Sequence, residues 1–127
     1  TSVQCEPVGI FRGPMVVSMR PVLEEQVELA VRVTEPHRHS HGAPVHIGRP
    51  EEIGIKDISR PEYGDPVEVR GGEVPIFWAC GVTPQAVLLN ARAPLAITHS
   101  PGHMFITDLR DDVPVQLFEA AESFLRD

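Results

Sequence analysis

The feature that most constrains this chain is an apolar run, residues 74–79, that passes directly into a polar turn, residues 80–85. Such a run is typical of a buried central strand. Thr83 can cap a helix that has Pro84 at its first position, and we expect this helix to continue to about Ala91. The first backbone N–H groups of a helix have no partner within that helix. The sequence therefore predicts an α/β arrangement in which polar groups gather at the tip of a central strand.

Shorter signals surround this strand. Pro and Gly, 13 and 10 in number, are spread along the chain as turn signals, including Gly71-Gly72. Strands and helices alternate, which predicts a mixed β-sheet with flanking helices in a single domain of 127 residues. We expect further strands at residues 15–19, 44–47, 66–70, 95–98 and 104–107, helices at 21–34 and 113–126, and one helical turn at 50–55.

Charge and composition exclude several classes of protein. The net charge is −7, and Lys and Arg are scattered rather than gathered in a stripe, so we expect no nucleic-acid partner. No apolar run approaches the roughly 20 residues that a membrane-spanning helix needs, so we expect no membrane partner. Cys5 and Cys80 are too few for a disulfide scaffold, which favours a cytoplasmic location. We interpret Cys5 as a small hydrophobic residue near the terminus.

The turn after the central strand is a candidate site for anion binding and catalysis. Gly81 permits close approach of the backbone. Free N–H groups at Gly81, Val82 and Thr83, with the helix dipole behind them, attract a carboxylate or phosphate, and Gln85 adds a polar side chain. A cysteine beside a helix start has a stabilised thiolate, so Cys80 is a candidate nucleophile. The alternative is a buried cysteine that only packs.

A second polar loop follows the expected strand at 95–98. His99 and His103 flank Pro101-Gly102, a type II turn signal that brings two imidazoles toward the same side. Two imidazoles suit a general acid/base pair or part of a metal site, to which Asp108 would add a carboxylate. The spacing matches no standard zinc motif, so the metal is unknown, with a divalent ion as one option. The alternative is one structural histidine and one solvated histidine.

Two other places carry candidate residues. His41 and His46 lie on either side of a turn of small residues and are candidates for substrate binding or metal ligation. Thr1 is a candidate catalytic nucleophile, because an N-terminal Thr can use its own amine as the base. The alternative for Thr1 is a chain end produced by trimming.

Four ordered segments, residues 13–21, 41–48, 75–85 and 97–108, together resemble the D-glutamate cyclase family, whose bacterial members are often named as hydro-lyases. Members of that family are longer, and this chain resembles their C-terminal half. Thr1 and Cys5 fall where the family commonly has Thr and Cys at the same spacing. Arg49 and Ser100 depart from the family pattern, where Asp and Ala are common.

The resemblance implies a fold, an activity and a partner. The implied fold is a two-subdomain α/β fold, of which residues 1–127 would be the C-terminal portion, completed by an N-terminal part as a separate chain or by self-association. The implied activity is loss of water from a small amino or hydroxy acid, most like cyclisation of D-glutamate to 5-oxo-D-proline. The competing hypothesis is a non-catalytic module that binds a small acid or a metal, or a subunit that completes a larger enzyme.

Overall fold

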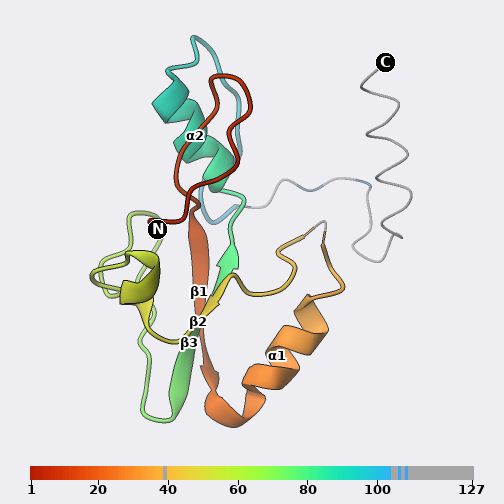
Figure 1. Ribbon diagram of the computed structural model, residues 1–127, viewed down its shortest axis with the longest axis vertical. Helices are drawn as coiled ribbons and strands as arrows, with labels where there is room; N and C mark the ends of the chain where they lie inside the picture. Colours follow the sequence, from red (N-terminus) through yellow and green to blue (C-terminus); the bar gives the residue numbers. More distant parts are fainter. Residues whose placement is uncertain (39, 104–105, 107, 109–127) are drawn as a thin grey trace.

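The computed structural model describes residues 1–38, 40–103, 106 and 108 (Figure 1). The strands form a small sheet, with α1 beside one end of it and α2 beyond the other end. In chain order the regular elements are β1 (Val17–Leu23), the 3-10 helix η1 (Glu24–Gln26), α1 (Val27–Thr34), β2 (His46–Ile47), the 3-10 helix η2 (Pro50–Ile53), β3 (Glu73–Ala79) and α2 (Thr83–Ala91). The class, with both α-helices and β-strands, is confirmed, but the described strands form an antiparallel sheet instead of the predicted mixed sheet.

The apolar run is the central strand, as predicted. The sheet has the order β1-β3-β2, and both neighbours are antiparallel to β3. β1 pairs along its whole length, from Val17 opposite Ala79 to Leu23 opposite Glu73. β2 contributes only His46 and Ile47, so the strand expected at 44–47 is shorter than predicted. β3 is therefore the central strand of the sheet, and its last residues lead into the turn that follows.

The predicted boundary at Pro21 is wrong. We expected a strand at 15–19 and a helix from 21, but Pro21 lies inside β1 opposite Pro75, and the helical segment begins at Glu24. The Pro75 carbonyl accepts from the Gly48 N–H on the β2 side, so the backbone groups of this pair point away from each other. Pro21 therefore has its nitrogen on the outer edge of β1, where a missing N–H removes no ladder hydrogen bond.

Other predicted elements have mixed outcomes. The helix at 83–91 is confirmed, and the turn at 50–55 is present as η2, which ends at Gly54 with φ +78°. The strands expected at 66–70 and 95–98 are absent, because neither stretch lies against a strand that could pair with it. Gly71-Gly72 forms a turn as expected. The strand at 104–107, apart from Ile106, and the helix at 113–126 lie outside the described residues.

The buried core is small. Among the described residues, the apolar side chains that are buried are Ile53, Ile76, Phe77, Trp78 and Val82. α1 approaches β3 at its last residue, where the Trp78 indole N–H donates to the Thr34 hydroxyl at 3.2 Å. α1 and α2 themselves contain no buried residue. No described helix is long and apolar enough to span a membrane.

The N-terminal segment forms a loop that doubles back and packs on α2. Isolated bridges join Gln4 to Pro14 and Val8 to Phe11. The loop approaches α2 at Gly13, where an added Cβ would lie 2.9 Å from the Asn90 side-chain nitrogen. This loop and α2 together form the end of the molecule that lies beyond the tip of β3 (Figure 1).

Candidate functional site

The tip of β3 is held in place by backbone hydrogen bonds to β1. The half-buried Cys80 donates its N–H to the Val16 carbonyl at 3.0 Å and accepts from the Thr83 N–H at 3.0 Å. Val82 is buried, with 5% of its surface exposed, whereas Gly81 is exposed. The turn is therefore anchored on both sides of an exposed glycine, and its backbone is open to a ligand at Gly81.

Two of the three predicted backbone donors are free. Within the described part of the chain, the N–H groups of Gly81 and Val82 have no hydrogen-bond partner, whereas the Thr83 N–H is bonded to Cys80. Pro84, in the first turn of α2, has no N–H. Two donors at the positive end of a helix attract a carboxylate. The turn therefore has the electrostatic character that the sequence predicted, with one donor fewer.

Thr83 positions the turn instead of capping α2. No side chain caps this helix. The Thr83 hydroxyl accepts from the Val16 N–H at 3.0 Å and donates to the Val16 carbonyl at 3.1 Å. The Thr83 hydroxyl thus makes the two hydrogen bonds that the backbone of a paired strand residue would make with Val16. These bonds hold the first turn of α2 against the start of β1. The predicted capping role is wrong, because the hydroxyl is already engaged by Val16.

His99 faces the same turn. A Cβ added at Gly81 would lie 3.6 Å from the His99 Nε2 atom, so the imidazole edge lies against the glycine. Nδ1 lies 2.9 Å from the Ser100 carbonyl. A carbonyl only accepts, so Nδ1 is the donor in this bond, and Nε2 is the ring nitrogen that faces the turn. Gln85 holds the loop down, because its side-chain nitrogen donates to the His99 carbonyl at 2.6 Å.

His41 reaches the tip of β3 from the opposite edge. Its Nδ1 donates to the Ala79 carbonyl at 2.5 Å, one residue before Cys80. The Phe77 carbonyl on the same edge accepts from the Val45 N–H, so the imidazole continues the hydrogen bonding that short β2 leaves unfinished. As in His99, the ring nitrogen that donates this bond is Nδ1. The structure therefore brings Cys80, His41 and His99 to one strand tip.

The remaining predicted site residues are engaged elsewhere. His103 follows the predicted type II turn, closed by its N–H on the Ser100 carbonyl at 3.0 Å with Gly102 at φ +77°, and its exposed ring bonds the Pro101 carbonyl. The ring of His46 packs on Phe77 and bonds the Arg49 carbonyl at 2.8 Å. No contact joins either ring to Cys80 among the described residues.

Among the described residues, no hydrogen bond or ion pair joins Thr1 or Asp108 to Cys80, Gly81 or His99. The Thr1 hydroxyl donates to the Met15 carbonyl at 2.7 Å, and the Thr1 amine lies 3.3 Å from the same oxygen. Asp108 is exposed. In the described part of the chain, no three or more His, Cys, Asp or Glu side chains form a group that could hold a metal ion. Among the described residues, the carboxyl with a shifted pKa is that of Asp57, where the Ser59 hydroxyl and N–H lower the pKa by hydrogen bonding.

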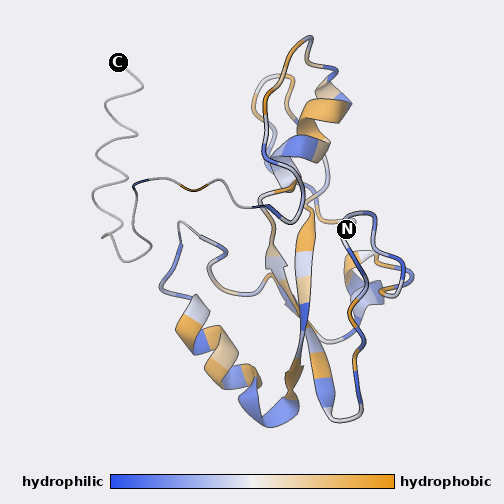
Figure 2. Ribbon diagram, turned by 180° about the vertical axis from the view of Figure 1, so that it is seen from behind, coloured by the Kyte–Doolittle hydropathy of each residue, from blue (hydrophilic) through white to orange (hydrophobic). Residues whose placement is uncertain are grey.

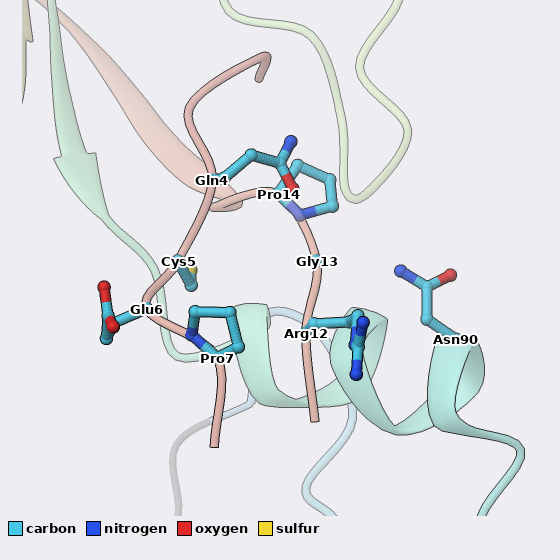
Figure 3. Close-up of a pocket in the computed structure, with 8 residues that line it drawn as sticks. All are labelled: Gln4, Cys5, Glu6, Pro7, Arg12, Gly13, Pro14 and Asn90. Carbon is cyan, nitrogen blue, oxygen red and sulfur yellow. The ribbon is translucent and has the colours of Figure 1, made fainter. Parts of the chain in front are cut away.

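Two open hollows lie away from the tip of β3. The larger, of about 710 Å³, lies between the N-terminal loop and α2 (Figure 3). Cys5 lies between the two stretches of the loop, and Arg12 and Asn90 lie together on one side. The sequence did not predict this hollow. Its one local signal is Gly13, whose missing side chain lets the loop approach α2. The smaller hollow is lined by Gly48, Arg49, Pro50, Glu51, Glu73, Val74 and Pro75.

Comparison with known proteins decides the family. The model of the D-glutamate cyclase family matches residues 1–108. The chain belongs to the D-glutamate cyclase family. The resemblance found in the sequence is thereby confirmed, and the matched region includes the strand tip and every predicted site residue from Thr1 to Asp108.

Three relatives show how much of a family member this chain represents. Proteins named "Putative hydro-lyase" from Bacillus licheniformis, Rubrobacter xylanophilus and Stutzerimonas stutzeri are 62%, 61% and 59% identical to it over 112, 111 and 112 residues. These alignments cover 88%, 87% and 88% of this chain but only 43%, 43% and 42% of the relatives. The chain thus spans less than half the length of these members of the D-glutamate cyclase family.

Proposed function

We propose that this chain is part of a hydro-lyase that binds a small acid at the tip of β3, and that its reaction is the cyclisation of D-glutamate to 5-oxo-D-proline. Membership of the D-glutamate cyclase family and the names of the relatives support this reaction class. The observation that carries the site is the position of His99, whose Nε2 lies against Gly81 beside two free N–H groups.

The reaction makes one bond and breaks one. The α-nitrogen forms a bond to the carbon of the γ-carboxyl group, and that carboxyl carbon loses one oxygen as water. Starting from the ammonium and carboxylate forms, nitrogen gives up two protons and the leaving oxygen takes up two. The protein must therefore move protons from nitrogen to oxygen and reduce the negative charge on the carboxylate under attack.

The strand tip has groups suited to both tasks. The Gly81 and Val82 N–H groups would hold a carboxylate and withdraw charge from it. His99 Nε2 would accept a proton from the amine and return it to the leaving oxygen. His41 would carry the second proton. Cys80 would either contact the substrate or form a thioester with its γ-carboxyl carbon, which loses an oxygen as water, and the α-amine would then displace the Cys80 thiolate to close the ring. Gln85 and Thr83 would keep the loop and turn in position.

Other predicted residues keep a place in the proposal. His103, four residues after His99, is a second candidate for proton transfer, with Asp108 as its carboxylate neighbour in the sequence. His46 would line the path of the substrate to the strand tip on the β2 side. Thr1, at the start of the chain, would act as a nucleophile. The competing hypothesis, a module that binds the acid without converting it, uses the same turn and differs only in turnover.

Loss of one water from D-glutamate is the measurement that tests this function. The chain is incubated with D-glutamate, alone and with the remaining segment of the Bacillus licheniformis relative, and the product is followed by mass spectrometry. His99→Ala should lower kcat by about 10²–10⁴-fold, because a general base contributes this much. His37→Ala is the matched control, since the exposed His37 side chain bonds to no described residue of the strand tip and the variant should leave the rate unchanged.

The other variants assign the roles. Loss of activity in His103→Ala as well as His99→Ala would indicate a pair of imidazoles, whereas full activity would indicate that His99 acts without it. Arg12→Ala tests the alternative that substrate binds in the hollow of Figure 3. Binding of D-glutamate without any loss of water, in either preparation, would contradict the enzyme and favour the binding module.

A further inference from the structure

Several of the most exposed large apolar side chains lie on α2 and on the segments next to it. Leu89 in α2 is 73% exposed, and Leu95 and Ile97 just after it are 81% and 92% exposed. Val8 and Ile10, on the loop that packs on α2, are 71% and 63% exposed. We call these five residues the α2 apolar patch. Figure 2 shows hydrophobic residues along α2 and the neighbouring loops at this end of the molecule.

The patch includes a stretch with the composition of a strand but no strand partner. Residues 95–98, Leu-Ala-Ile-Thr, follow α2 without regular structure, and within the described part of the chain their backbone groups make no backbone hydrogen bond. The stretch is nevertheless fixed at its end, because Gln85 bonds the carbonyl of His99. An exposed, unpaired apolar stretch of this kind is a template for pairing with another strand.

Exposed patches of large apolar side chains mark surfaces that another polypeptide covers. The length of the relatives identifies the polypeptide, because the chain spans about 43% of the Bacillus licheniformis and Rubrobacter xylanophilus proteins, which leaves more than half of each without a counterpart here. We propose that the α2 apolar patch docks the polypeptide that corresponds to this remaining part, and that residues 95–98 pair with one of its strands.

The location of the patch gives the docking a consequence for the site. Residues 95–98 lead directly into His99, and α2 begins at the turn that contains Gly81. A polypeptide seated on the patch would lie next to the open side of the strand tip. The inference stands without the proposed reaction, because it rests on exposure and unpaired backbone, and its test measures binding.

The test uses this chain and the segment of the Bacillus licheniformis relative that has no counterpart in it, produced separately. Sedimentation and isothermal titration should show a one-to-one complex. Leu95→Asp and Ile97→Asp should each weaken it at least ~10-fold, because a charge would be buried in an apolar contact. Val33→Asp is the matched control, an equally drastic change at a 52% exposed residue of α1, at the other end of the molecule, and should leave the affinity unchanged.

Hydrogen exchange tests the pairing itself. The amides of residues 95–98 should exchange slowly in the complex and rapidly in the chain alone. Absence of a complex would overturn the proposal, as would equal weakening by Val33→Asp. Self-association of the chain that Ile97→Asp abolishes would assign the patch to a second copy. A lowered melting temperature of the Ile97→Asp chain alone would show that residues of the same chain cover the patch.

Discussion

Thr83 shows how a single hydroxyl positions the candidate site. It is the only partner of the Val16 N–H among the described residues, whereas the Val16 carbonyl also accepts from Cys80. Thr83→Val keeps the shape and leaves that half-buried N–H unpaired, which should lower the free energy of unfolding by about 1–3 kcal/mol. Thr83→Ser keeps the hydroxyl and should cost less than about 1 kcal/mol. Urea denaturation of both variants measures the difference, and equal losses would contradict the role given to the hydroxyl.

At the residue scale, the sequence predicted local chemistry better than long-range contacts. The type II turn at Pro101-Gly102 and the helix start at Pro84 depend on neighbours in the chain, and both are present. The bond between Thr83 and Val16 spans 67 positions, and no local pattern announces it. The hydrogen bond between His41 and Ala79 spans 38 positions, so it too could not be predicted from a local pattern. His41 and His99 were identified as candidates, but only the fold shows that both lie at the tip of β3.

Among the elements, η2 depends on a glycine that the N-terminal segment packs against. Gly54 has φ +78°, and an added Cβ would lie 2.7 Å from the Ser2 Cβ and 3.0 Å from the Ser2 nitrogen. The Ser2 N–H donates to the Ile53 carbonyl at 2.8 Å, so the backbone there cannot move away without losing this bond. Gly54 therefore joins the first residues of the chain to the turn that buries Ile53.

A pair of glycine variants separates backbone strain from steric overlap. Gly64 has φ +74° with nothing within 4 Å of an added Cβ. Gly64→Ala should therefore lower the free energy of unfolding only by the cost of a left-handed backbone at alanine, about 1–2 kcal/mol. Gly54→Ala has the same backbone cost, and steric overlap with Ser2 should lower the free energy of unfolding by a further amount of about 1–3 kcal/mol. Thermal unfolding of the two variants should therefore rank Gly54→Ala well below Gly64→Ala, and similar melting temperatures would show that the N-terminal segment does not hold Ser2 in place.

The prediction of elements failed where pairing, rather than composition, decides the outcome. Residues 66–70 alternate apolar and polar side chains and residues 95–98 are rich in strand-forming residues, yet neither stretch has a neighbouring strand. Pro21 was interpreted as a helix start, but an edge strand accepts a proline whose nitrogen faces outward. Residues 74–79 were predicted correctly because an apolar run of this length is favourable only when both its faces are covered.

For the whole molecule, the contrast between a small core and extensive apolar exposure is the main property. Five apolar side chains are buried in the described part of the chain, whereas fifteen large ones are substantially exposed. A chain with this balance has a small margin of stability, since the net stability of ordinary domains is only about 5–15 kcal/mol. The docking that we propose for the α2 apolar patch would cover part of this exposed surface.

The small core makes one substitution decisive for folding. Phe77 is 1% exposed at the centre of β3 and packs against the His46 ring. Phe77→Ala should remove about 3–5 kcal/mol, which is most of the stability available to such a core, and should leave the chain without a cooperative unfolding transition. Leu95→Ala, at an 81% exposed position, should change stability by no more than about 0.5 kcal/mol in the isolated chain. Trp78, the single tryptophan, reports the urea transition by fluorescence from within the core. A wild-type midpoint for Phe77→Ala would contradict the central place given to Phe77 in the core, whereas loss of the transition would support it.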